Sequence, residues 1–167
     1  EKQSISAHIK PINQIAQLIS LEPKTVGDDS LIDRQLLDVA FKKSDAKILI
    51  IRTLPNLQSK KNRDYSHSNP PYFSAEAMAF LVQSGIEHLI VDLPSVDKEK
   101  DDGALLAHKL FWNHPGFENR KHCSITELVF VPESAQDGFY FCQVTFPPFV
   151  NDASPASVLL FALLTEA

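Results

Sequence analysis

Two side chains of the types that bind divalent metals follow an apolar segment in the middle of the chain. Residues 85–97 read GIEHLIVDLPSVD, a glycine turn, an apolar run typical of a buried strand, and a polar end. His108 comes shortly afterwards, and Glu127 follows it in Ile-Thr-Glu. Open α/β sheets bind ligands at the carboxyl ends of their strands, and imidazole and carboxylate are zinc ligands. The pattern indicates a metallohydrolase-type site, for which two ligands are too few.

Each of these residues also has a structural interpretation. A lone histidine such as His108 is more often a surface or capping residue than a ligand. A carboxylate within a strand points to solvent by default, which applies to Glu127. Asp92, Ser95 and Asp97 follow the apolar run and could be turn or capping residues. The residue types and their spacing leave both interpretations open.

The sequence contains no competing catalytic motif. It has no Gly-x-Ser-x-Gly elbow, no glycine-rich phosphate loop and no Cys-x-x-Cys pair. His67, His114 and His122 lie in expected loops without the spacing of metal ligands. Cys123 and Cys142 are expected to be reduced, buried thiols of a cytoplasmic protein.

Composition predicts one globular domain covering residues 1–167. Charged residues make up 22% and hydrophobic residues 44%, as in ordinary soluble proteins. The net charge of −5 argues against a nucleic-acid partner. No apolar run reaches the length of a membrane span, so no membrane partner is expected either.

The middle of the chain predicts a strand–helix–strand unit. The apolar, β-branched run at 46–53 and the run at 87–93 predict buried strands. Between them, residues 75–84 predict a helix capped by Ser74, with Gly85 directly after its end. Two strands joined through a helix are expected to pair in parallel.

The flanking segments predict the remaining elements. A strand is expected at 14–21, a short helix at 105–112, and a capping box of Ser30 with Asp33 predicts a helix start. That helix would place Ile32, Leu36, Val39 and Ala40 at helical spacing. The polar loop at 54–72 is long enough to be functional.

Three strands are expected in the last third of the chain, at 124–131, 138–146 and 157–165. Asp137-Gly138 supplies the turn residues between the first two. The predicted fold class is therefore α/β, a mixed sheet with central βαβ units and C-terminal antiparallel strands.

Several segments resemble those of a known family in the same order. Residues 73–97, FSAEAMAFLVQSGIEHLIVDLPSVD, resemble the S-x-E-A…G…D-x-x-S-x-D segment of the cyclase-like metal-dependent hydrolases, which include bacterial kynurenine formamidase and isatin hydrolase. His108 is similar to the family's late metal-binding histidine, and Glu127 to its metal-binding glutamate. Residues 151–155, NDASP, resemble its closing D-G-S-P turn. The resemblance extends from about residue 48 to residue 164.

The resemblance implies a cyclase-like swivelling β/β/α domain with the activity of a metal-dependent arylformamidase. Water activated by zinc or manganese would attack the carbonyl of an aryl formamide or cyclic amide, as in tryptophan catabolism through kynurenine. The implied assembly is a homo-oligomer, and the implied partner is a small-molecule amide substrate. The resemblance assigns His108 and Glu127 to the metal, and it assigns supporting or substrate-loop positions to Asp92, Ser95, Asp97, Tyr65 and Tyr72.

The chain departs from the family at its signature, His-x-Gly-Thr-His-x-Asp-x-Pro-x-His. This motif supplies the other ligands and the acid/base histidine, and no stretch of the sequence fits it; His8 is isolated. The interval from His108 to Glu127 is also longer than in the family. We therefore expect the acid/base histidine upstream of Glu1, in a missing N-terminal part of the domain. The alternative is an inactive homologue that binds a small molecule or forms oligomers without metal.

Overall fold

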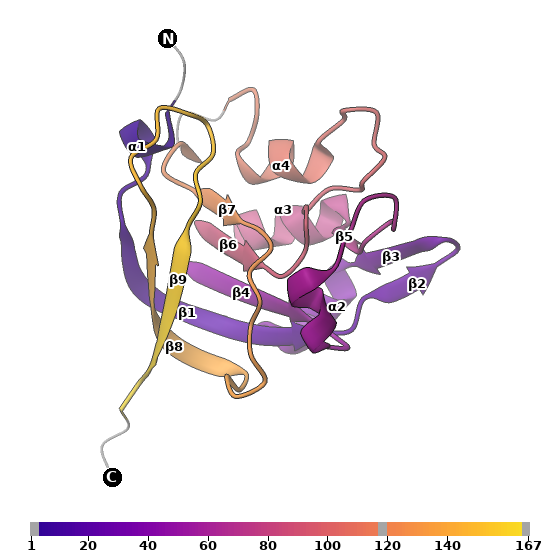
Figure 1. Cartoon of the computed structure of the whole chain (residues 1–167), viewed down its shortest axis with the longest axis horizontal. Helices are drawn as coiled ribbons and strands as arrows, with labels where there is room; N and C mark the ends of the chain where they lie inside the picture. The colour runs from indigo at the N-terminus through magenta and orange to yellow at the C-terminus, as the bar shows by residue number, and fades with distance from the viewer. Residues whose placement is uncertain (1–3, 117–119, 165–167) are drawn as a thin grey trace.

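A six-stranded mixed sheet lies at the centre of this computed structural model, which describes residues 4–116 and 120–164 (Figure 1). Four neighbouring strands pair in parallel, and the last two strands are antiparallel to their neighbours. The mixed α/β class is therefore confirmed. In order across the sheet the strands are β7 (Ser124–Thr126), β6 (His88–Val91), β4 (Ile48–Thr53), β1 (Ile12–Leu21), β8 (Gly138–Thr145) and β9 (Ser157–Ala162).

The predicted strand–helix–strand unit is present as β4, α3 (Ala75–Gln83) and β6. The Ser74 hydroxyl accepts a hydrogen bond from the Ala77 N–H, 3.2 Å away, and so caps the helix. Gly85 follows the helix with φ of +79°, a conformation in which glycine meets no steric penalty. All six residues of β4 are buried, because strands lie on both of its sides and side chains cover both of its faces.

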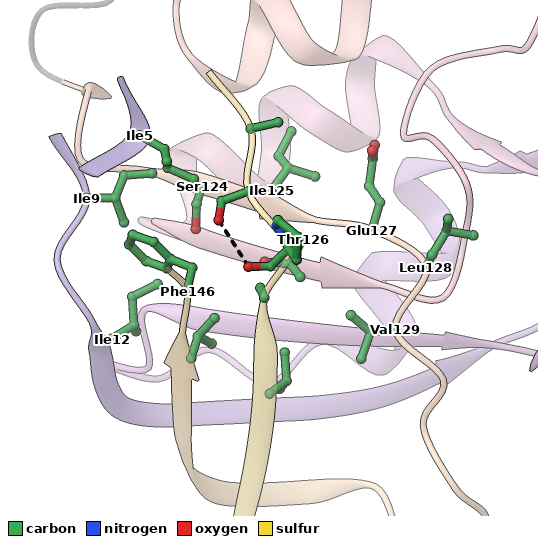
Figure 2. Close-up of a pocket in the computed structure, with 16 residues that line it drawn as sticks. Ile5, Ile9, Ile12, Ser124, Ile125, Thr126, Glu127, Leu128, Val129 and Phe146 are labelled. Carbon is green, nitrogen blue, oxygen red and sulfur yellow. Dashed lines mark hydrogen bonds between the residues drawn. The ribbon is translucent and has the colours of Figure 1, made fainter. Parts of the chain in front are cut away.

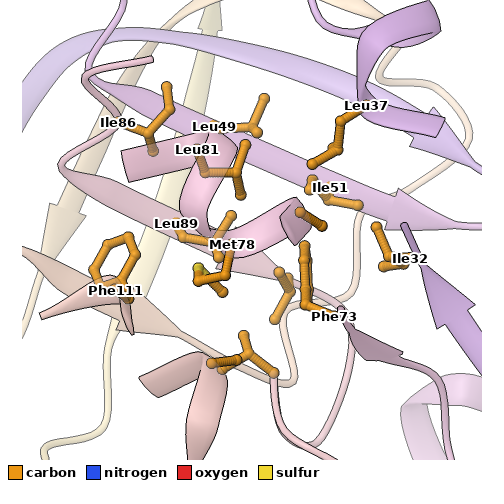
Figure 3. Close-up of a cluster of buried hydrophobic side chains, with 14 of the residues drawn as sticks. Ile32, Leu37, Leu49, Ile51, Phe73, Met78, Leu81, Ile86, Leu89 and Phe111 are labelled. Carbon is orange, nitrogen blue, oxygen red and sulfur yellow. The ribbon is translucent and has the colours of Figure 1, made fainter. Parts of the chain in front are cut away.

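Hydrophobic side chains cover both faces of the main sheet. On one face, helix α3 places Met78 and Leu81 against Leu49 and Leu89 of the strands (Figure 3). Helices α2 (Arg34–Ala40) and α4 (Leu106–Phe111) contribute to the same cluster. On the other face, the segment that follows β7 covers the strands with Val129, Val131 and Ala135.

The predicted start of helix α2 (Arg34–Ala40) is wrong by three residues, because the cap is Asp33 and not Ser30. Ser30 belongs to strand β3 (Asp29–Ile32), which pairs with β2 (Lys24–Val26) and β5 (Tyr72–Phe73) in a separate three-stranded sheet. Asp33 caps the helix instead, accepting from the Leu36 N–H at 2.9 Å. Ile32 is buried as a strand residue, and Val39 is 90% exposed on the helix. Strand pairing, which the local spacing does not reveal, holds residues 29–32 extended.

The last third of the chain was predicted only in part. The strand expected at 124–131 ends at Thr126, and it pairs in parallel with β6, not antiparallel with β8. Asp137 therefore forms no hairpin turn between them; its carboxylate accepts bonds from Ser20 and Arg52. Strands β8 and β9 are antiparallel as expected, but β9 ends at Ala162. Position 165 of the predicted strand lies outside the described residues.

The remaining elements are short. Helix α1 (Ile5–His8) lies against the loop before β9, because the Ile5 N–H donates to the carbonyl of Asn151 at 2.8 Å. The 54–72 loop contains a 3₁₀ turn, η1 (Gln58–Asn62). Both cysteine thiols are free and buried, as expected. In the part of the chain that the structure describes, no helix has the length and apolarity needed to cross a bilayer.

Candidate functional site

The His108 and Glu127 side chains converge. His108 lies on helix α4, and Glu127 follows directly after β7, where its side chain extends from the end of the strand (Figure 2). His108 Nε2 and Glu127 Oε1 are 3.7 Å apart, and both side chains are about a quarter exposed. Both residues therefore present polar atoms to one partly open space, as the sequence predicts.

Asp97 fixes the orientation of His108. Its Oδ2 lies 2.6 Å from His108 Nδ1, and its two oxygens accept the backbone N–H groups of Ala107 and His108 at 2.5 and 3.2 Å. Leu105 occupies the N-cap position of helix α4 with φ of +46° and provides no side-chain hydrogen bond. Asp97 therefore caps the helix from a loop that precedes it in the sequence. Because Nδ1 faces a carboxylate, the hydrogen of a neutral ring lies on Nδ1 and leaves the Nε2 lone pair free.

The charges in this group shift one another's pKa values. Burial raises the pKa of Asp97, but the bonds from His108 and the Ala107 N–H outweigh burial and lower it. Burial lowers the pKa of His108, but the bond to Asp97 and the charge of Glu127 raise it overall. Burial also raises the pKa of Glu127, only partly offset by His108 and by the Val96 N–H that Oε1 accepts at 3.0 Å.

Trp112 supports His108 from the other side and was not identified from the sequence. The two rings stack with centroids 5.6 Å apart and an interplanar angle of 28°. The indole Nε1 donates to the carbonyl of Cys123 at 3.0 Å, which fixes the ring. Their i, i+4 spacing around helix α4 was the available signal, because such side chains are neighbours on a helix surface.

His108 and Glu127 line a cavity of about 640 Å³, and Glu127 also lines a second cavity of about 390 Å³, which Figure 2 shows. His8, which has no partner motif in the sequence, also lines the larger cavity. In the sequence His8 is isolated and lacks the partner residues of the signature, and local spacing does not show that the fold brings α1 to this cavity. The wall of the larger cavity combines apolar and polar side chains, among them Ile5, Ile9, Leu105, Lys109, Trp112, Lys121, Ile125 and Asp152.

The other predicted site residues have structural contacts. Asp92 is buried beyond the end of β6, where it accepts from the Thr53 N–H and hydroxyl and pairs with Lys60 Nζ at 2.8 Å. Ser95 accepts from the Asp97 N–H and so supports the loop that carries Asp97.

The two predicted aromatic residues of the loop lie elsewhere. The Tyr72 hydroxyl donates to Asp29 at 3.0 Å, and the Tyr65 ring lies under the Arg63 guanidinium. Neither residue lines the two cavities beside Glu127. Their contact with an aromatic substrate stays a prediction.

The donor pair fits one divalent ion. Two protein ligands that each lie about 2.1 Å from a shared ion are at most about 4.2 Å apart, and the observed separation of 3.7 Å is within that limit. A histidine that donates its other ring N–H to a carboxylate is the usual arrangement at a metal. Within residues 4–116 and 120–164, no group of three His, Cys, Asp or Glu could hold an ion. The described residues therefore supply this pair and no third donor.

Solved structures share this fold. A "potential metal-dependent hydrolase with cyclase activity" superposes with a TM-score of 0.68 and 17% identity, over 96% of this chain and 74% of the other. A "predicted metal-dependent hydrolase" from Bacillus stearothermophilus gives 0.64 and 18%, over 89% and 63%. Isatin hydrolase A from Labrenzia aggregata, bound to benzyl benzoate, gives 0.53 and 11%, over 94% and 63%. The chain thus spans less than two thirds of two of these proteins.

Sequence comparison assigns the family. No curated protein sequence matches the chain significantly. A family model described as "Putative cyclase" matches residues 3–98, more than half of the 167 residues. The match includes Asp92, Ser95 and Asp97 and ends before His108 and Glu127, whose assignment rests on the resemblance and on the geometry above. The chain therefore belongs to the cyclase family.

Proposed function

We propose that the chain contributes His108 and Glu127 to the divalent-metal centre of a hydrolase that cleaves a C–N amide bond. The observation that carries this proposal is that His108, held by Asp97, and Glu127 converge at the wall of one cavity. Membership of the cyclase family supports it, as do the descriptions of the structural neighbours as metal-dependent hydrolases.

In this proposal each residue has a defined task. A bound divalent metal, zinc or manganese, supplies a water of lowered pKa and polarises a carbonyl. His108 offers Nε2 to the ion, Asp97 holds the imidazole through Nδ1, and Glu127 offers a carboxylate oxygen. The ring of Trp112 and the side chain of Ile125 give the cavity an apolar wall that suits the aryl group of an aryl formamide or cyclic amide.

The proposal requires more ligands than the described residues supply. The acid/base histidine and the remaining donors would come from outside the described residues.

A homo-oligomer and a cytoplasmic location belong to the same proposal. The second candidate is an inactive homologue that binds a small molecule without metal, and the observation that favours it is the lack of a third donor among the described residues.

Metal content of the full-length protein separates the two candidates. We expect stoichiometric zinc or manganese by inductively coupled plasma mass spectrometry, lost in His108→Ala and in Glu127→Ala because each removes a ligand. Glu133→Ala, which changes an exposed carboxylate, should keep the metal. Hydrolysis of N-formyl aromatic amines should follow metal content across this series.

Two results would contradict the enzyme proposal. One is wild-type protein that binds neither metal. The other is a folded His108→Ala variant with unchanged metal content.

A further inference from the structure

A buried ion pair lies at the start of the segment that leads to the candidate site. Asp92, directly after β6, and Lys60, in the η1 turn, lie 2.8 Å apart between Oδ2 and Nζ. Only 1% of the Asp92 side chain and 13% of the Lys60 side chain are exposed. Lys60 belongs to the 54–72 loop, which is long enough to be functional but whose two predicted aromatic residues do not line the cavities. The ion pair connects this loop to the end of a central strand.

Thr53, the last residue of β4, completes the ion pair. Lys60 Nζ donates to the Thr53 carbonyl and, at 2.9 Å, to its hydroxyl, so the three ammonium hydrogens all have acceptors. The Asp92 carboxylate accepts the Thr53 N–H at 2.9 Å and the Thr53 hydroxyl at 3.0 Å. Because β4 and β6 pair in parallel, their ends meet at one edge of the sheet, where Lys60 bridges them (Figure 1). We name these three residues the Lys60 junction.

The segment that starts at the Lys60 junction contacts both candidate ligands. Residues 92–97 end in Asp97, whose Oδ2 lies 2.6 Å from His108 Nδ1. One residue earlier, the Val96 N–H donates to Glu127 Oε1 at 3.0 Å. One short segment therefore helps to set the positions of both side chains.

Packing and backbone hydrogen bonds restrict the movement of this segment. Leu93 and Val96 are 2% and 0% exposed. The Leu93 carbonyl accepts from the Leu128 N–H, and the Val96 carbonyl accepts from the Phe73 N–H, both at 2.9 Å. Closely packed interiors transmit displacements instead of absorbing them. A shift of Asp92 at the start of the segment would therefore reach the groups that contact the candidate ligands.

We propose that Lys60 is a positioning residue for the candidate metal site and acts through Asp92 and the 92–97 segment. A buried ion pair contributes little net stability, since taking two charges out of water offsets most of their attraction. It does fix a geometry, because the ammonium and the carboxylate share the same carbonyl, N–H and hydroxyl groups of Thr53. The inference rests on the proposed function for the presence of a metal.

The first test is the affinity of the full-length protein for zinc and manganese, measured by competition with a chelator. Lys60→Met keeps an unbranched apolar stem but leaves the Asp92 charge without its partner. We expect the affinity to fall by about two- to thirtyfold, the range for residues that act on a site through others. Lys61→Met is the matched control, because Lys61 is exposed in the same turn and its ammonium lies over the Phe130 ring. It should keep the wild-type affinity.

The second test does not require metal. Hydrogen exchange of the metal-free full-length protein reports how often individual backbone amides open. We expect the N–H groups of Val96, Ala107 and His108 to exchange at least about tenfold faster in Lys60→Met than in the wild type. These three groups donate to the two carboxylates of the candidate site. Strand β8, which β1 separates from β4, should keep its wild-type exchange rates.

A double variant covers the case in which Lys60→Met does not fold. Lys60→Met combined with Asp92→Asn leaves no unpaired buried charge, and the amide oxygen can still accept a hydrogen bond from Thr53. Circular dichroism should show that it folds. Because it also lacks the ammonium, it should show the same lower metal affinity and the same faster exchange.

The two tests separate this inference from the hydrolase proposal. A wild type without metal, combined with the local increase in exchange, would refute the hydrolase and keep the positioning role of Lys60. Bound metal with unchanged affinity in the folded variants would refute the positioning role and keep the hydrolase. Unchanged exchange rates, or faster exchange that extends equally to β8, would also overturn the inference, because Lys60 would then act on overall stability or not at all.

Discussion

The His108 side chain receives a separate restraint on each of its surfaces. Asp97 binds Nδ1, Trp112 stacks against the ring, and Glu127 faces Nε2. Fixing a side chain before its ligand arrives lowers the entropic cost of binding. At this scale the sequence singled out Asp97, His108 and Glu127, and the structure brings their side chains together; their role at a metal stays a prediction. Their tertiary contacts and the position of Trp112 depend on where α4 lies, which local spacing does not encode.

Asp97→Asn tests the restraint on Nδ1. Asparagine has nearly the same shape, but its single acceptor oxygen cannot serve both the helix N–H groups and the imidazole as a carboxylate does. We expect metal affinity to fall by about 10–100-fold, measured by competition with a chelator. Asp102→Asn is the matched control, because Asp102 is exposed, and asparagine tolerates its positive φ. Equal affinities for the two variants would contradict a positioning role for Asp97.

His88 should make stability depend on pH. It is 4% exposed in β6, its Nδ1 lies 3.0 Å from the Ser124 hydroxyl, and burial lowers its pKa from 6.5 to about 4. Between pH 6.5 and 4 the unfolded chain therefore binds a proton that the folded protein excludes, so the free energy of unfolding falls as the pH decreases. The histidine contributes up to roughly 3 kcal/mol to this loss at pH 4.

Urea unfolding at a series of pH values measures the His88 contribution. The His88→Asn variant cannot titrate in this range, and its amide can still bond to Ser124. The loss of stability between pH 6.5 and 4 should be smaller for this variant than for the wild type. If the free energy of unfolding fell with pH equally in the two proteins, His88 would not be the group that causes the loss of stability.

At the scale of elements, the sequence predicted correctly the elements whose ends are set by residues close to them in the chain. The central strand–helix–strand unit carries its own cap, its own terminating glycine and an uninterrupted apolar strand, and all three are observed. The errors arose in segments whose conformation is set by pairing or packing with residues far away in the sequence. Residues 29–32 form a strand because β2 and β5 flank them, and residues after Thr126 leave the sheet because they cover its other face.

The observed cap of α2, Asp33, can be compared with the predicted cap, Ser30, by replacing each with alanine. Asp33→Ala removes the side chain that accepts the Leu36 N–H, and it also removes the ion pair with Lys24. We expect it to lower the free energy of unfolding by about 1 kcal/mol. Ser30→Ala should cost less, because Ser30 lies in β3 and caps nothing. Thermal unfolding of the two variants is the measurement. If Ser30 were the cap, Ser30→Ala would destabilise the protein more than Asp33→Ala.

At the scale of the whole molecule, the two faces of the sheet near β9 differ in character. One face carries the exposed apolar side chains of Ile15, Phe141, Leu159 and Phe161, and the other borders the 390 Å³ cavity that Glu127 also lines. Composition predicted a globular domain but not this division, because both faces draw on the same apolar residue types. The division follows only from the strand order, which places β8 and β9 next to β1 and beyond the cover of the helices.

Helix α1 forms part of the wall of the cavity that contains His108. The Ile5 N–H donates to the carbonyl of Asn151, and Ile5 and His8 line the same cavity as Asp152 and Ala153. One backbone hydrogen bond therefore joins two parts of that wall which are more than 140 residues apart in the sequence. The shape of the space beside the imidazole thus depends on a contact that involves neither His108 nor Glu127.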